Sequence, residues 1–110
     1  MTQENNYSVT ATQVIVIDPM LFREIKKGEK RIIIPHNVRA SIDITLFKCF
    51  LTGDEMTKDI QIITRYCLKN LHKHYIDKLR FETEIELYRF LCEMRPTLKM
   101  GDTVTMFTFN

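Results

Sequence analysis

Five cations lie close together in residues 23–31, where one predicted element ends and the next begins. They are Arg23, Lys26, Lys27, Lys30 and Arg31. We name Lys26, Lys27, Lys30 and Arg31 the lysine corner. Because the stretch also contains Glu24 and Glu29, its net charge is +3. Such a cluster can attract a phosphate group or the backbone of RNA. Cations near the end of a helix also stabilise the helix without a ligand, so the cluster has a purely structural explanation as well.

A polar connection, His36 to Ser41, follows shortly after the lysine corner. Asn37 and Arg39 can contact a base edge or a phosphate, since a guanidinium offers several donors in a fixed geometry. His-Asn is also ordinary turn chemistry, which needs no ligand.

A second basic region spans residues 65–80 and has a net charge of +4. Its charged residues are Arg65, Lys69, Lys73, Lys78 and Arg80, against Asp77. Tyr66 and Tyr75 lie among them. Basic residues interleaved with aromatic rings suit single-stranded nucleic acid, because charges meet phosphates and rings stack on bases. A solvated helix face with its tyrosines turned to the core explains the same pattern.

The chain has no catalytic or metal-binding motif. Cys49, Cys67 and Cys92 are odd in number and far apart, which argues against a disulfide framework and fits a reducing compartment. Their apolar surroundings predict buried, inert thiols. His72 and His74 have no identifiable third partner, so no metal site is predicted. With no nucleophile elbow and no glycine-rich phosphate loop, the residues neither assign an enzyme activity nor imply a cofactor.

Local signals predict the elements that position these residues. Val14–Ile17 is a short β-branched strand. Asp18 suits a helix cap, Pro19 suits the first helical position, and Gly28 suits a left-handed helix end. The next strand is predicted at Arg31–Ile34.

In the rest of the chain, predicted strands outnumber predicted helices. We expect a hairpin joining Ile42–Leu51 to Asp59–Tyr66 through a turn at residues 52–55. Leu68–Arg80 fits either a helix or a long loop. Beyond it, Thr83 and Glu86 form a capping-box pattern at the start of a helix, Glu84–Met94, whose core-facing residues are Leu87, Phe90, Leu91 and Met94. Thr103–Phe109 is a last strand.

This order predicts an α+β fold, a small mixed β-barrel with helices at its openings, because closure removes exposed strand edges. The first and last strands are expected to be neighbours in the closed sheet. Length and composition (110 residues, 45% hydrophobic, net charge +2) predict one domain at residues 11–110 after a polar leader at residues 1–10. No apolar run is long enough for a membrane span, which indicates a cytoplasmic protein without a membrane partner.

The opening segment resembles the ASCH domain of the PUA-like superfamily. That family commonly begins with a strand, a helix of the form F-x-x-I-x-x-G, and then G-x-K before a strand. Phe22, Ile25, Gly28 and Lys30 fit this pattern. The end of the chain, from Thr83 onward, is similar to small bacterial ASCH amidohydrolases that act on acetylated cytidine. The resemblance implies a PUA-like barrel with a ligand cleft beside the lysine corner.

The resemblance also has specific departures. Three residues after the family's lysine those amidohydrolases have a catalytic threonine, and this chain has Ile33. Two positions further on, the usual arginine is replaced by Pro35. No match for the family's catalytic glutamate can be placed, since Leu68–Arg80 does not align.

The sequence thus predicts an ASCH-like domain that binds RNA or a nucleotide-derived ligand in a basic cleft. The predicted binding residues are Lys27, Lys30, Arg31, Asn37, Arg39, Lys73 and Tyr75. Two alternatives stay open. One is a hydrolase of a modified nucleoside with Lys30 as the activating cation, which requires a replacement for Ile33. The other is a protein-interaction or accessory module with a vestigial cleft.

Overall fold

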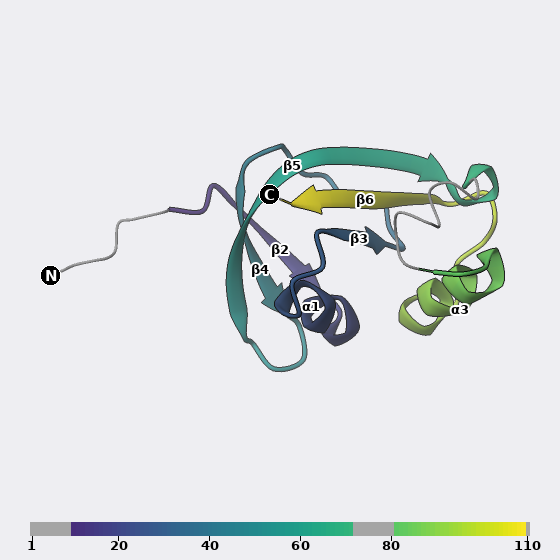
Figure 1. Ribbon diagram of the computed structural model, residues 1–110, viewed down its shortest axis with the longest axis horizontal. Coiled ribbons are helices and arrows are strands. Elements are labelled where there is room, and N and C mark those ends of the chain that lie inside the picture. The colour runs from purple at the N-terminus through teal and green to yellow at the C-terminus, as the bar shows by residue number, and fades with distance from the viewer. Residues whose placement is uncertain (1–9, 72–80, 110) are drawn as a thin grey trace, which may run out of the picture.

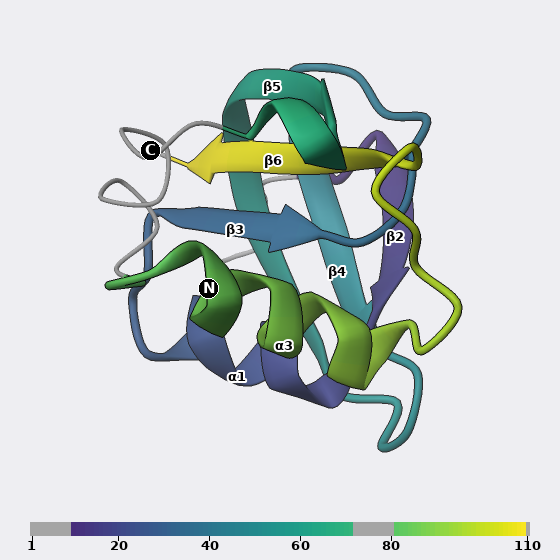
Figure 2. The same cartoon turned by 90° about the vertical axis from the view of Figure 1, so that its right-hand side faces the viewer.

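The computed structural model describes residues 10–71 and 81–109, and within them the chain forms five strands, two α-helices and one 3₁₀ turn (Figure 1). In chain order these are β2 (Gln13–Ile17), α1 (Pro19–Lys26), β3 (Arg31–Ile34), β4 (Ile44–Cys49), β5 (Glu55–Cys67), η1 (Leu68–Asn70), α3 (Glu84–Met94) and β6 (Thr103–Phe109). Both helices lie on the same side of β6 (Figures 1 and 2). The α+β class predicted from the sequence is confirmed.

All five strands belong to one sheet, in the order β2-β4-β5-β6-β3. The pair β2–β4 is parallel, and the other three pairs are antiparallel. The prediction that the first, second and last strands share a sheet is therefore confirmed. The prediction that the first and last strands are neighbours is wrong, because β6 lies between β5 and β3. Among the described residues β2 and β3 form the two edges of the sheet, which is not a closed barrel.

β5 joins the two halves of the sheet because it is long enough to serve both. Residues 55–59 pair with β4, and residues 60–67 pair with β6. The register shifts between Ile60 and Ile62, and such an irregularity bends a strand and increases its twist. The β4–β5 hairpin is confirmed. Its second strand begins earlier than predicted, at Glu55, which pairs with Lys48 across the hairpin and is not part of the turn.

The opening strand–helix–strand forms as its local chemistry predicts. The Met20 amide donates to the Asp18 carboxylate at 2.9 Å, and Pro19 occupies the first turn of α1. Gly28 follows the helix with φ +100°, a left-handed conformation that glycine adopts at little cost. The apolar face of α1 is buried against the sheet through Leu21, Phe22 and Ile25.

The helix predicted at Glu84–Met94 is confirmed with the same bounds. The Glu86 amide donates to the Thr83 hydroxyl at 3.1 Å. The Glu86 carboxylate accepts from the Glu82 amide at 3.3 Å, one residue before the partner that a capping box predicts. Leu87 and Leu91 are buried, whereas Phe90 and Met94 are half-buried.

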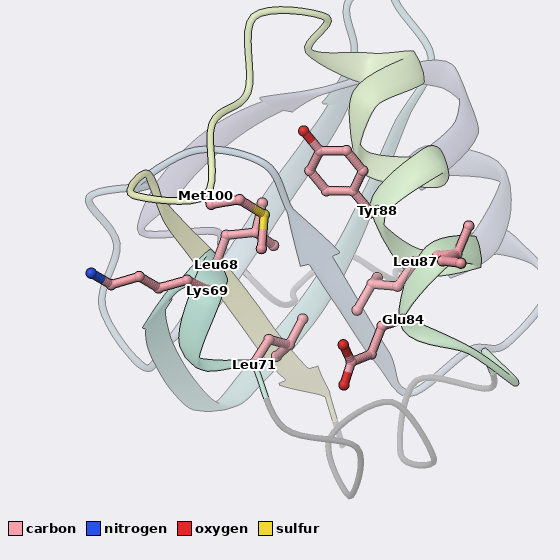
Figure 3. A pocket seen from close by; sticks show the side chains of 8 residues that line it. Leu68, Lys69, Leu71, Glu84, Leu87, Tyr88 and Met100 are labelled. Atoms are coloured by element: carbon pink, nitrogen blue, oxygen red, sulfur yellow. The ribbon is translucent and has the colours of Figure 1, made fainter.

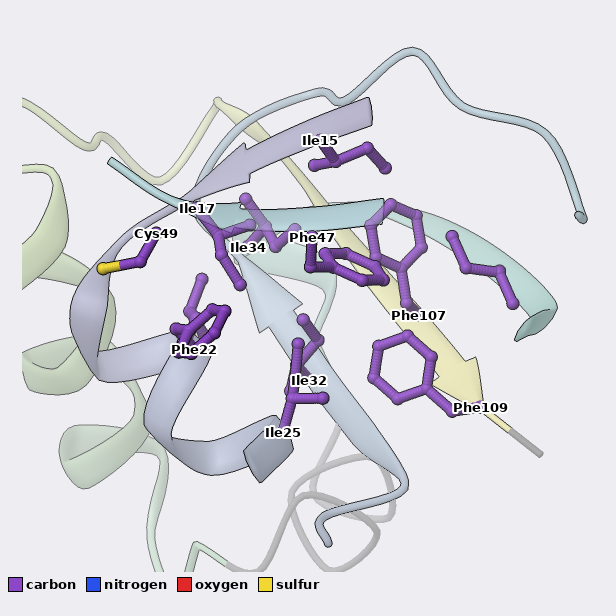
Figure 4. Packing of buried hydrophobic residues seen from close by; sticks show 12 residues of the cluster. Ile15, Ile17, Phe22, Ile25, Ile32, Ile34, Phe47, Cys49, Phe107 and Phe109 are labelled. Carbon is purple, nitrogen blue, oxygen red and sulfur yellow. The ribbon is translucent and has the colours of Figure 1, made fainter. Parts of the chain in front are cut away.

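Two apolar clusters form the core. The first fills the space between α1 and the sheet, where the Phe47 ring packs edge-on against Phe107 and Phe109 (Figure 4). The second lies under α3 and includes Leu87, Leu91 and residues from β3, η1 and β6. Phe90 and Met94 pack against both clusters, so α3 connects them.

Candidate functional site

The lysine corner forms where α1 ends and β3 begins. Lys27 caps the C-terminus of α1, with its amide donating to the Arg23 carbonyl at 3.0 Å. The four side chains of the corner are exposed. The Lys27 ammonium lies 4.0 Å from the Glu24 carboxylate, a long ion pair that offsets part of the charge. The corner is therefore an exposed cationic surface on a tightly turned backbone.

The backbone of β3 places this corner at one end of β6. Arg31 pairs with Thr108, and the Phe109 amide donates to the Lys30 carbonyl at 2.7 Å. Lys30 and Arg31 therefore lie beside the final residues of β6.

The polar connection that contains Asn37 and Arg39 is held by side chains distant in the sequence. The buried Thr105 hydroxyl donates to the His36 carbonyl at 2.7 Å, and it accepts from the Val38 amide at 2.9 Å. The Arg65 guanidinium donates to the Asn37 side-chain oxygen at 3.1 Å and to the Val38 carbonyl at 2.7 Å. These four hydrogen bonds fix a connection whose side chains at positions 36, 37 and 39 are exposed.

His36 adds no positive charge to this connection at neutral pH. Partial burial lowers the pKa of His36 below its usual value of 6.5, and the nearby Arg95 lowers that pKa further. Arg95 is fixed in place, since its guanidinium donates to the Pro35 carbonyl at 2.9 Å and lies 3.7 Å from the Asp102 carboxylate.

The lysine corner and the connection lie at opposite ends of β3 (Figure 2). Arg31 begins the strand opposite Thr108, whereas Ile34 ends it opposite Thr105, whose hydroxyl holds the connection. At about 3.3 Å per strand residue, the two ends of β3 are separated by roughly 10 Å. The structure thus brings Lys27, Lys30 and Arg31 together in one group, and Asn37 and Arg39 together with Arg65 in another. Lys73 and Tyr75 lie outside the described residues.

Sequence reasoning did not assign Thr105 and Arg95 to the connection. Thr105 lies between the apolar residues Val104 and Met106, but this signal is weak because the same strand contains two other threonines. Arg65 was predicted to belong to a basic region with Tyr75, but its described partners are Asn37 and Val38.

Ile33, at the position where the resembling amidohydrolases carry threonine, is a core residue. Its side chain is 1% exposed and packs in the cluster under α3. The adjacent recess, lined by Glu24, Arg31, Phe81 and Phe90 among others, has a volume of about 20 Å³. That volume accommodates about one water molecule. Ile33 therefore cannot supply the nucleophile that threonine supplies in those amidohydrolases, and the recess formed by the described residues is too small for a nucleoside.

A larger recess, of about 290 Å³, lies between the end of β2 and the end of β3. Apolar side chains, including Phe50, make up most of its lining, and its ionisable groups are Asp18 and His36. The Asp18 carboxylate already caps α1, and His36 is held neutral. Sequence reasoning missed Phe50 as part of a recess, because its neighbours there come from distant segments.

The cysteines differ from the expectation of three buried thiols. Cys49 is buried, whereas Cys67 and Cys92 are half-buried, because β5 and α3 each turn only one face fully to the core. No group of three His, Cys, Asp or Glu side chains in residues 10–71 and 81–109 could hold a metal ion. His72 and His74 lie outside those residues.

Two further observations bear on identity. In the described part of the chain no helix is long and apolar enough to cross a membrane. A scan against protein-family models and searches of curated proteins and solved structures gave no match.

Proposed function

We propose that the protein is an ASCH-like domain that binds single-stranded RNA in the cytoplasm. In this proposal the lysine corner attracts phosphates at one end of β3. At the other end of β3, Asn37 and Arg39 contact the RNA, and Arg65 supports the segment that carries them. Lys73 and Tyr75 are proposed to add a charge and a stacking surface.

The separation of the two groups along β3 is the observation that carries this proposal. A strand length of roughly 10 Å lies between Arg31 and the connection. Two groups of cations along one strand suit a ligand with several phosphates in a row, such as an extended polynucleotide, since single-strand binding sites commonly span several nucleotides. RNA is therefore proposed in preference to a small nucleotide-derived ligand, which offers fewer phosphates.

The fixed backbone of the connection supports the same proposal. Thr105 and Arg65 hold the segment before any ligand arrives. Binding then requires little ordering of the backbone that carries Asn37 and Arg39, and avoided ordering cost contributes to affinity.

The ASCH-like part of the proposal rests on the opening segment. Phe22 and Ile25 are the buried residues of α1, Gly28 ends the helix in a left-handed conformation, and Lys30 precedes β3. These are the roles that the F-x-x-I-x-x-G and G-x-K pattern requires. A PUA-like barrel, here open between β2 and β3, is proposed on the same basis.

Hydrolysis of a modified nucleoside is less well supported. It requires a reactive group at or near Ile33, which is buried among leucines, and a cavity larger than the recess beside Arg31. We therefore expect the purified protein not to hydrolyse acetylcytidine.

A salt titration with a single-stranded RNA oligonucleotide tests the proposal. Replacing Lys30 and Arg31 together by alanine should weaken binding and reduce the slope of log K against log salt. The expected reduction is roughly 1–2 units, at about 0.7 unit for each lost phosphate contact. The measurement is fluorescence anisotropy at several salt concentrations.

The double variant Lys48→Ala with Arg89→Ala is a matched control. It removes one lysine and one arginine from exposed positions on β4 and α3, so the change in net charge is the same. Equal weakening by both double variants would contradict a localised site. Absence of binding by the wild type at low salt would overturn the RNA proposal and favour an interaction module, and hydrolysis of acetylcytidine would favour the enzyme.

A further inference from the structure

A groove with a volume of about 270 Å³ lies between η1 and the first half of α3 (Figure 3). We name it the α3 groove. Its lining comes from η1 and the residue after it, from α3, and from the loop before β6: Leu68, Lys69, Leu71, Glu84, Ile85, Leu87, Tyr88 and Met100. At about 30 Å³ for each water molecule, the volume equals roughly nine waters, enough for one or two amino-acid side chains.

The groove has an apolar floor and an exposed apolar rim. Leu68, Leu71 and Leu87 are buried at its base. Ile85 and Met100 remain 65% and 51% exposed. Exposed apolar side chains around a recess are typical of interaction sites, whereas single ones scattered over a surface are not.

Of the two charged side chains that line the groove among the described residues, Glu84 and Lys69, only the carboxylate points into it. The Glu84 carboxylate points into the groove, between Leu71 and Leu87, whereas the Lys69 side chain extends away from α3 (Figure 3). Glu82 and Glu86, two residues before and two residues after Glu84, are exposed as well, so the start of α3 is acidic. A cation held near Glu84 would be attracted, and a phosphate would be repelled.

We propose that the α3 groove binds a peptide segment in which an apolar side chain lies next to a lysine or arginine. The apolar side chain packs on the floor formed by Leu68, Leu71 and Leu87, and the cation reaches the Glu84 carboxylate beside it. None of the described residues of the α3 groove belongs to the lysine corner or to the connection at Asn37 and Arg39, so the peptide proposal and the RNA proposal can be tested independently.

Three short synthetic peptides test the proposal by NMR on the whole protein. The first contains phenylalanine and leucine, each followed by a lysine or arginine. The second replaces those cations by glutamate, and the third replaces the apolar residues by serine. We expect the first peptide to shift the backbone amides of residues 68–71 and 84–88 in a saturable manner. We expect the second and third to bind at least roughly fivefold more weakly, since charge and apolar contact each contribute.

Variants at exposed positions make the result specific. Glu84→Gln should weaken binding of the first peptide about threefold to fivefold, the range for an exposed ion pair. Ile85→Ser should also weaken binding of this peptide. Both variants should stay folded because these side chains are exposed. Glu93→Gln is the control, because it removes an exposed carboxylate from the other end of α3. This variant should bind the first peptide with the same affinity as the wild type.

Several outcomes would overturn the proposal. They are equal binding of the acidic peptide, unchanged affinity in Glu84→Gln, and the absence of shifts at millimolar peptide. Shifts of the same amides with protein concentration alone would identify a second copy as the occupant, and shifts on adding RNA would assign the groove to nucleic acid.

Discussion

Replacing Thr105 by valine should loosen the connection between β3 and β4, which Arg65 continues to hold, while keeping the shape of the side chain. The Thr105 hydroxyl makes two hydrogen bonds, to the His36 carbonyl at 2.7 Å and from the Val38 amide at 2.9 Å. Each intramolecular hydrogen bond contributes about 0.5–1.5 kcal/mol, so the loss of both should cost about 2 kcal/mol. Water can reach the exposed connection, which keeps the cost below that of two fully buried, unpaired groups.

Urea denaturation measures this cost. For an m-value of about 2 kcal/mol/M, the midpoint should fall by roughly 1 M. Amide exchange gives a local measure, because the Val38 amide loses its partner and should exchange faster. Thr105→Ser is the matched control: it keeps the hydroxyl and both hydrogen bonds, so the Val38 amide should remain protected. If Thr105→Val leaves both the midpoint and the Val38 exchange rate unchanged, the connection is held by other contacts and the reasoning is wrong.

Three further predictions concern stability. Phe90→Ala should lower the free energy of unfolding by about 2–3 kcal/mol, measured by thermal or urea denaturation. This is less than for a fully buried ring, because Phe90 is half-buried and packs against Phe81 at a centroid distance of 5.2 Å. An unchanged melting temperature would contradict its core position. Gly28→Ala should cost about 1–2 kcal/mol through its φ of +100°, whereas Gly101→Ala should change stability by less than about 0.5 kcal/mol, since the space around both glycines is open and only Gly28 has a positive φ. Folding lowers the pKa of His36, so the stability that its neutral form contributes is present above pH 6.5 and is lost as the pH falls through the folded pKa. His36→Gln should remove this part of the pH dependence of stability. Parallel stability–pH curves for the variant and the wild type would show that His36 does not contribute.

The sequence predicted those elements whose causes are local. Asp18, Gly28 and Thr83 act within a few residues of their own positions, and all three have the predicted roles. The order of strands in the sheet depends on which distant segments pair. The neighbours of β6 could therefore not be chosen from periodicity, and the expected contact between the first and last strands was wrong.

The candidate site also has one part that depends on local sequence and one part that depends on distant residues. The lysine corner is contiguous in the sequence, and the structure keeps it together. The connection depends on Arg65 and Thr105, which lie 27 and 67 residues from Val38. Contacts over such separations leave no periodic signal in one sequence. The α3 groove was missed for the same reason, since its walls come from three separate segments.

The central position of β6 has a consequence for how the chain folds. β6 pairs with β5 on one side and with β3 on the other, although both strands precede it in the chain. While the protein is being synthesised, the β4–β5 hairpin can form as soon as it leaves the ribosome. The edges of β3 and β5 that β6 will occupy stay unpaired until residues 103–109 emerge. Unpaired edges promote association between nascent chains, and pairing over such long separations is slow. Folding of this domain should therefore finish with the insertion of β6.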